Sequence, residues 1–277
     1  SAERAYAAQT GLVGGGGLPN HTTPMRWVDG PKALAAGADA LQVRFESVDN
    51  AAGVKLVKTY SLPRGDYLIG VKHEVSNTGA APVKPSLYLQ LERDGNAARG
   101  ESKWYLTFTG PAIYTEEKKF QKIDFSDIEK GKTSHVTAAN DGWLAMVQHY
   151  FASAWIVPGN APREFATAKV NTNLYRASMV LPLGEIAPGQ SVTRESKLFA
   201  GPQEEKKLEA LAPGLDLVKD YGWFTFLSKP LFWLLDQLNS VLHNWGWSIV
   251  ALVVLLKIAF YWLNASAYRS MAKMKKV

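Results

Sequence analysis

The stretch VKLVKTYSLPRGDYLIGVKHEV, residues 54–75, decides the fold class. Two runs within it alternate apolar and polar side chains, and the turn signal Pro63-Arg64-Gly65 separates them. Alternation with a period of two is typical of β-strands that bury one face, and a proline-glycine break between two such runs is typical of a turn. The stretch therefore predicts two neighbouring antiparallel strands.

The same pattern continues on both sides of this pair. Short alternating runs with turn signals between them recur at roughly ten-residue spacing over residues 40–203, and no helical heptad interrupts them. This predicts two packed antiparallel sheets rather than a βαβ fold. Residues 148–157, QHYFASAWIV, are almost continuously apolar and predict a central buried strand. Residues 1–39, rich in glycine and alanine with GGGG at 14–17, predict an irregular segment.

The period changes after residue 203. Residues 204–214 predict a short helix that has acids near its start and ends at a proline-glycine pair. Residues 221–243 predict an amphipathic, aromatic-rich helix in which Ser228 caps the first turn and Pro230 lies inside that turn. Such a helix directly before a membrane span is expected to lie in the membrane interface. The alternative is a helix packed on the edge of the sandwich.

The last apolar stretch predicts a transmembrane helix. Residues 245–263 read WGWSIVALVVLLKIAFYWL, with Lys257 as the one formal charge. A helix of this length spans about 28 Å, close to the hydrocarbon thickness of a bilayer. Aromatic rings expected at the headgroup level are Trp223, Trp233, Trp245, Trp247, Tyr261 and Trp262.

Charge asymmetry predicts the orientation of this helix. Residues 264–277 continue as a basic, helical-looking segment without acids, which places the C-terminus in the cytoplasm and residues 1–244 on the outer side. The chain begins with serine and shows no N-terminal apolar run, so we expect a piece of a longer polypeptide. The basic side chains expected to anchor the cytoplasmic end are Arg269, Lys273, Lys275 and Lys276.

Bulk composition excludes several function classes. The net charge is +6, and the one cluster of a single sign is at the C-terminus. Before the span, basic residues are interspersed with acids, so no basic stripe for nucleic acid is present. The chain has no cysteine, which excludes disulfides and thiol chemistry. The histidines show no metal-ligand spacing, and we expect neither a metal site nor a cofactor. They are His21, His73, His135, His149 and His243.

Several stretches resemble the YidC family of bacterial membrane protein insertases. They are KTYSLPRGDYLIGVKHEVSN at 58–77, FTGPAIYTEEKKFQKIDF at 108–125, GWLAMVQHYFASAW at 142–155, residues 216–233, and residues 244–274 with NWGWS and SMAKM. The resemblance implies a periplasmic domain of β-supersandwich type, an interfacial helix, the family's second transmembrane helix and the start of a cytoplasmic helix, all in the bacterial inner membrane. It implies no bond chemistry, cofactor or metal.

The resemblance also implies a function and partners. The family assists the insertion and folding of nascent membrane proteins through a hydrated groove, alone or with the Sec translocon and its accessory membrane proteins. Ribosome contacts would use parts outside this chain. Lys257 aligns with the arginine that supplies the groove cation in the family, and the alternative for it is simple snorkelling from a position about 9 Å inside the helix end. Trp262 stands where relatives often have proline.

Two other function classes stay open. The supersandwich is also the architecture of sugar mutarotases, which would need a paired acid and base. Adjacent strand residues His73 and Glu74 point to opposite faces and cannot form that pair, whereas His149 with Glu164 or Glu185 could. The third class is a docking module for translocon partners, peptide or lipid. The aromatic run at 104–108, WYLTF, could line a groove for it or belong to the sandwich core.

Overall fold

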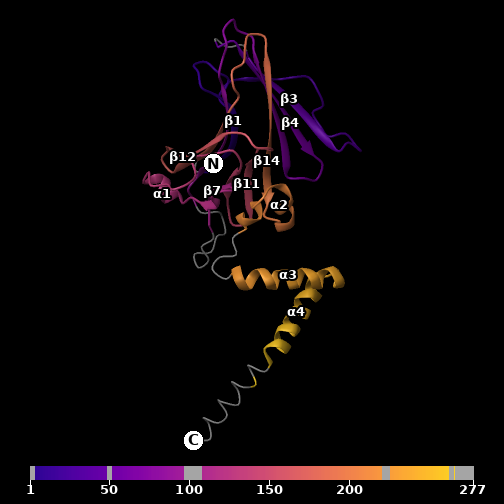
Figure 1. Ribbon diagram of the computed structural model, residues 1–277. Coiled ribbons are helices and arrows are strands. Elements are labelled where there is room, and N and C mark those ends of the chain that lie inside the picture. Colours follow the sequence, from indigo (N-terminus) through magenta and orange to yellow (C-terminus); the bar gives the residue numbers. More distant parts are fainter. Residues whose placement is uncertain (1–3, 49–51, 97–107, 220–224, 262–264, 266–277) are drawn as a thin grey trace. The chain divides into compact units, whose positions relative to one another are not determined.

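The computed structural model describes residues 4–48, 52–96, 108–219, 225–261 and 265. The chain forms two compact units, residues 1–219 and 220–277. The first unit consists of strands with three short helical turns, and the second contains two helices (Figure 1). Each unit is described here by itself.

Two antiparallel sheets build the first unit. The larger has nine strands in the order β2-β3-β4-β5-β14-β11-β10-β7-β8, and the smaller has five in the order β1-β6-β13-β12-β9. The strands of the larger sheet are β2 Met25–Trp27, β3 Ala40–Ser47, β4 Val54–Pro63, β5 Leu68–Asn77, β7 Gly110–Thr115, β8 Lys119–Lys122, β10 Trp143–Val147, β11 Phe151–Ile156 and β14 Ser191–Pro202. Those of the smaller are β1 Tyr6–Val13, β6 Ser86–Asp94, β9 Ala138–Ala139, β12 Arg163–Asn171 and β13 Leu174–Pro182.

The main core lies between the two sheets. Leu89 and Met179 of the small sheet belong to the same buried cluster as Leu56 and Leu144 of the large sheet. Trp155 of β11 crosses this layer, and its indole Nε1 donates to the Gln90 carbonyl of β6 at 3.1 Å. The sandwich and the strand pair predicted from residues 54–75 are therefore confirmed: β4 and β5 pair antiparallel.

A second core covers the outer face of β7, β10, β11 and β14. Helix α2, Glu205–Leu211, and the 3-10 turn η1, Leu215–Val218, lie over this face and bury Leu208 and Leu215 completely. The Trp143 indole donates to the Pro213 carbonyl at 2.9 Å and holds the turn between α2 and η1. Gly214 has a φ of +69°, and a Cβ there would lie 2.3 Å from the Tyr114 ring. Only glycine fits this position.

The N-terminal prediction was wrong for residues 6–13. These residues form β1, which pairs along β6 from Tyr6 opposite Arg93 to Val13 opposite Ser86. Glycine content concealed the strand. A Cβ on Gly11 would lie 2.6 Å from both the Asn20 Cα and the Tyr88 hydroxyl, so this glycine marks a close approach inside a strand rather than a loop. β2 also lies within the segment predicted as irregular.

Two smaller predictions within the sandwich also need correction. The stretch 148–157 is not one strand, since residues 148–150 turn between β10 and β11. His149 is half-buried in that turn, not in a buried strand. Its neighbour Tyr150 is strongly exposed, so apolar content alone could not show the turn. The short helix α1, Phe125–Glu129, was not predicted, and the predicted aromatic strand at 104–108 lies outside the described residues except for Phe108.

A buried cation is held by backbone carbonyls alone. The Arg163 side chain is almost completely buried and contacts the loop before β10 and the loop between β11 and β12. Its guanidinium donates to five carbonyls, with donor–acceptor distances from 2.7 to 3.4 Å. The acceptors are the carbonyls of Asn140, Gly142, Val157, Gly159 and Ala161.

Three polar side chains connect the sheets inside the main core. The Thr10 hydroxyl of β1 lies 2.6 Å from His73 Nε2 of β5, and Lys58 Nζ of β4 donates to the Thr10 carbonyl at 2.6 Å. His73 is fully buried and Lys58 nearly so. Burial lowers the pKa of Lys58 to about 8, and burial together with the Lys58 charge lowers the pKa of His73 to about 3.

We expect stability to rise between pH 8 and 10.5 because of Lys58. The unfolded chain keeps this proton up to its ordinary pKa of 10.5, whereas the folded chain releases it near 8, so each step upward in this window favours the folded state. The full effect is on the order of 3 kcal/mol. Urea unfolding across this window should show the rise in the parent and lose it in Lys58→Met. An equal rise in both proteins would refute the assignment.

The second unit consists of α3, Thr225–Leu242, and α4, Trp245–Ala259, which contact each other. Asn244 caps α4, and its side chain accepts from the Trp247 backbone N–H at 3.2 Å. The cap predicted at Ser228 was wrong, because helix is already present at Thr225 and Pro230 lies inside it. Within the described ranges, no helix is both long and apolar enough to cross a membrane. The predicted span at 245–263 is described as helix over Trp245–Ala259, and the predicted helix at 264–277 lies almost wholly outside the described residues.

Candidate functional site

The helical unit presents an extensive apolar surface. On α3, Phe226, Trp233 and Val241 are exposed, and Trp233 has 64% of its surface accessible. On α4, exposed aliphatic side chains follow one another through the whole helix. Patches of this size mark a membrane or protein contact. The exposed apolar residues of α4 and its C-terminal end are Trp245, Trp247, Ile249, Val250, Val253, Val254, Leu255, Ile258, Phe260 and Tyr261.

The predicted interfacial aromatics divide into two groups. Trp233, Trp245, Trp247 and Tyr261 lie within the described residues and are exposed, as a headgroup contact requires. Trp223 and Trp262 lie outside the described residues. The predicted cytoplasmic anchor also lies outside them, namely Arg269, Lys273, Lys275 and Lys276.

Lys257 occupies the last turn of α4 and is exposed. A cation is favoured at this end of a helix by the macrodipole. Its neighbours one turn before and after along the helix are Val253, Val254 and Tyr261, all exposed and none charged. The helix itself contains no acid that could pair with it. The ammonium is thus the single cation on the apolar surface of α4. This fits either a groove cation or a lysine that snorkels to the membrane surface.

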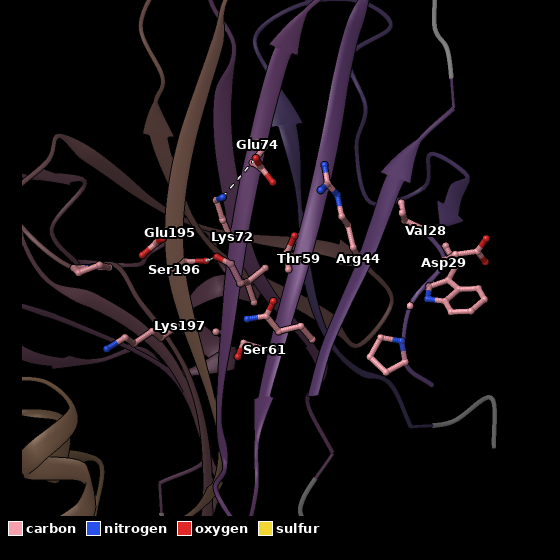
Figure 2. A pocket seen from close by; sticks show the side chains of 17 residues that line it. Val28, Asp29, Arg44, Thr59, Ser61, Lys72, Glu74, Glu195, Ser196 and Lys197 are labelled. Carbon is pink, nitrogen blue, oxygen red and sulfur yellow. Dashed lines mark hydrogen bonds and ion pairs between the residues drawn. The ribbon is translucent and has the colours of Figure 1, made fainter. Parts of the chain in front are cut away.

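The sandwich contributes a second candidate site, a groove of about 660 Å³ on the outward face of the large sheet (Figure 2). Strand register explains its floor. Ser61 stands opposite Gly70, so the side chains of this pair are small and leave space above the sheet. Thr59 stands opposite Lys72, the next pair on this face. The segment at 27–31 forms one wall with Trp27, and Pro158 lies at the other side.

Charges of both signs alternate across the groove. Lys72 Nζ lies 3.5 Å from Glu74 Oε1, and the β14 residue opposite Lys72 is Glu195. Arg44 on β3 and Lys197 on β14 extend this pattern to both sides. Cationic and anionic side chains in the lining balance, so the groove has no preference for a ligand of one sign.

The groove gives no support to the sugar-enzyme alternative. Its described lining contains no histidine, and His73 points into the core while its neighbour Glu74 faces the groove. The opposite orientation predicted for these two residues is confirmed. His149 packs edge-on against Tyr150 in the β10–β11 turn, and Glu185 forms an ion pair with Lys84 at 3.1 Å. In the part of the chain that the structure describes, no group of three metal-ligating side chains gathers.

Sequence reasoning found the helical unit but missed the groove. The signal was present in the alternation, because residues 59, 61, 70, 72 and 74 are the positions that face away from the core. Which strands lie side by side was not readable, however. β5 neighbours β14, which follows it by more than a hundred residues in the chain. Lys72 and Glu195 stand opposite each other only because β5 and β14 pair in this register.

Comparison with known proteins identifies the family. A family model described as the YidC periplasmic domain matches residues 1–234. A membrane protein insertase YidC of Janthinobacterium sp. (strain Marseille) is 53% identical over 99% of this chain and 48% of its own length. That of Cupriavidus necator is 55% identical over 98% of this chain and 48% of its own length. The chain spans about half the length of these curated relatives.

One solved structure shows the limits of fold likeness. A galactose mutarotase related enzyme from Lactobacillus acidophilus is similar with a TM-score of 0.43 and 11% identity, over 65% of this chain and 72% of that one. Likeness at this level carries no argument about function. The match of the family model and the identity to curated relatives decide the matter: the chain belongs to the YidC family of membrane protein insertases.

Proposed function

We propose that this chain is the periplasmic sandwich, the interfacial helix and the second transmembrane helix of a membrane protein insertase and chaperone. Its clients are nascent proteins of the bacterial inner membrane. The observation that carries the proposal is identity of 53–55% with insertases along almost the whole chain. The protein works without breaking covalent bonds, since its task is to lower the barrier for polar segments that enter hydrocarbon.

The proposed topology follows the charge pattern. Residues 1–244 lie in the periplasm, residues 245–263 cross the inner membrane, and the basic C-terminus lies in the cytoplasm. The exposed apolar surface of α3 and α4 supports a lipid environment for this unit. α3 rests in the outer interface with Trp233 at the headgroup level.

Lys257 serves as the cation of a hydrated groove in this proposal. It stands alone among uncharged neighbours on α4, where an ammonium is costly in lipid and useful in a water-filled groove. Further helices of the full-length protein complete the groove. Lysine keeps the charge of arginine but lacks its planar five-donor fork, so contacts to client segments are made by one mobile ammonium.

Partners beyond the client belong to the same proposal. The Sec translocon and its accessory membrane proteins dock on the periplasmic sandwich, and the ribosome contacts cytoplasmic parts of the full-length protein. The groove on the large sheet supports a docking role because it is open and its charged lining is balanced in sign. Its described lining contains no histidine that could pair with a glutamate, as the mutarotase alternative would need.

The depth of α3 is directly measurable because the chain has no cysteine. A single cysteine that replaces Trp233, labelled with an environment-sensitive fluorophore, should show a blue-shifted emission in liposomes, since its position lies at the headgroup level. A label at Gln190, an exposed position on the sandwich, is the control. Equal, water-like emission at both positions would contradict an interfacial helix.

Complementation tests the proposed function. The full-length protein that contains this chain, expressed in Gram-negative cells depleted of their own YidC-family insertase, should restore insertion of a single-span client, measured by protease protection. Normal abundance in the inner membrane must be shown in the same cells. Abundant, correctly located protein that leaves the client uninserted would overturn the proposal.

A further inference from the structure

We propose that one end of the sandwich, formed by the tip of the β10–β11 hairpin and the β4–β5 turn, docks on the lipid headgroup surface of the outer leaflet. We call these residues, Tyr67, Tyr150 and Phe151, the aromatic end. The inference rests on the proposed function, because it takes the protein to be anchored in a bilayer. It assigns to the sandwich itself a lipid contact that is separate from that of α3 and α4.

The aromatic end exposes large rings where a soluble domain would place polar turn residues. Tyr150 is 70% exposed, Phe151 56% and Tyr67 47%. Turns are ordinarily built from glycine, asparagine, aspartate and proline, so two successive aromatics at a hairpin tip are unfavourable unless they find an apolar environment. Tyrosine and phenylalanine are suited to the boundary between headgroups and acyl chains.

Backbone contacts hold the three rings together. Phe151 stands opposite Pro202 at the end of β14, and the backbone N–H of Gln203 donates to the Tyr150 carbonyl at 2.9 Å. The Gln203 side chain donates to the Gln148 carbonyl at 2.8 Å, which closes the tip against β14. Tyr67 joins them, since the Ala200 N–H donates to its carbonyl at 3.0 Å. A Cβ on Gly201 would lie 2.6 Å from the Tyr67 Cβ, so this side chain covers the last residues of β14.

The chain leaves the sandwich beside the same end. Figure 1 shows β11 and α2 together at one end of the sheets. Lys219 Nζ lies 3.4 Å from Glu205 Oε2 in the first turn of α2, two residues after the Gln203 that closes the hairpin tip. Six residues lie between Val218, the last buried residue of η1, and Thr225, where helix α3 is present. Such a segment spans at most about 25 Å. A bilayer that holds α3 is therefore within reach of the aromatic end.

Two lysines beside the aromatic end are held in ion pairs. Lys207 Nζ forms an ion pair with Asp66 at 2.6 Å and lies 5.1 Å from the centre of the Tyr67 ring, and Lys219 pairs with Glu205. Lysines paired with carboxylates attract anionic lipid less than unpaired ones do. The tip residues Tyr150 and Phe151 also do not line the groove described above, and a protruding tip suits a soft, flat surface. Docking should thus depend on ring burial and respond weakly to salt.

Site-specific fluorescence quenching tests the proposal in the full-length protein reconstituted into vesicles of zwitterionic lipid. A cysteine at Glu204, exposed beside Gln203, carries the fluorophore, and lipids with a headgroup nitroxide carry the quencher. The matched control label stands at Gln190, just before the opposite end of β14. β14 has 12 residues, so its ends lie about 36 Å apart. We expect strong quenching at 204 and little at 190.

Variants show whether the rings carry the contact. In the 204-labelled protein, Tyr150→Ser with Phe151→Ser should lower the ratio of docked to undocked sandwich roughly tenfold, because two apolar rings no longer leave water. Val13→Ser removes an exposed apolar side chain at the far end of β1 and should leave quenching unchanged. Equal quenching at 204 and 190, or quenching at 204 that survives the double substitution, would overturn the inference.

The test separates this inference from the proposed function. The label at 204 could stay unquenched while a label at 233 still reports a membrane interface and complementation still succeeds. In that case the sandwich does not touch the bilayer, and the proposed function stands. If the label at 233 also reports water, the membrane anchoring itself fails. Replacement of zwitterionic by anionic vesicles provides a further check, since quenching at 204 that requires anionic lipid would contradict docking by ring burial.

Discussion

Replacement of Arg163 by methionine is expected to lower the free energy of unfolding by about 3–5 kcal/mol. The guanidinium donates to five backbone carbonyls of two loops and is almost completely buried. Methionine fills a similar volume but donates nothing, so five hydrogen bonds are lost, and of the five carbonyls the Asn140 carbonyl keeps the Ala161 N–H as a donor. The loss is a large part of the stability of a typical domain.

Two further substitutions make this prediction specific. Arg163→Lys keeps the charge but offers three donors without the planar fork, and we expect a loss between those of the parent and the methionine variant. Arg26→Met removes an exposed arginine that pairs with Glu46, and it should cost less than about 1 kcal/mol. Urea unfolding of the chain in mild detergent measures all three. If the substitutions at positions 163 and 26 lower the free energy of unfolding equally, the hydrogen bonds from Arg163 to the five carbonyls are not a source of stability.

Acidification is expected to destabilise the sandwich through His73. Burial and the nearby Lys58 charge lower the pKa of His73 to about 3, whereas the unfolded chain takes up its proton near the ordinary value of 6.5. Between these values the unfolded state binds the proton and the folded state does not, so stability is full above pH 6.5 and is lost as the pH falls toward 3. The full effect is on the order of 4 kcal/mol.

The variant His73→Gln isolates this effect from the carboxylates. Glutamine has an amide that can bond to the Thr10 hydroxyl but does not titrate. Glu46, whose pKa is lowered to about 2 chiefly by hydrogen bonds from Lys55 and Arg26, contributes to acid sensitivity in parent and variant alike. Unfolding curves at pH 7 and pH 4 should therefore differ less in His73→Gln than in the parent. An identical difference would show that His73 is not the group that titrates.

Most of the sandwich could be predicted from alternation alone. β3, β4 and β5 fall where alternating runs stood in the sequence. β4 and β5 bury one face in the core, and β3 alternates exposed and half-buried side chains over most of its length. β1 could not be predicted, since Gly11 sits in it for a close approach to Asn20 and Tyr88 that only the folded chain reveals. The aromatic turn at 148–150 was concealed for the opposite reason, because its rings are apolar yet exposed.

The candidate sites were predictable to different degrees. Lys257 stood out as a single charge in an apolar run, and the proposal that it is the groove cation comes from family resemblance rather than from periodicity. The groove on the large sheet could not be predicted, because strand order brings β14 beside β5 across a long stretch of sequence. Contacts between distant strands are set by the whole fold and leave no local pattern.

The central claim is that Lys257 faces clients in a hydrated groove of an insertase. The most direct test places a photoreactive residue at 257 of the full-length protein, with a ribosome-stalled nascent membrane protein as the bait. Position 258, which is exposed on a neighbouring part of α4, is the control. We predict crosslinks to the nascent chain from 257 and few from 258. If position 257 crosslinks to lipid alone and not to the nascent chain, the account is contradicted.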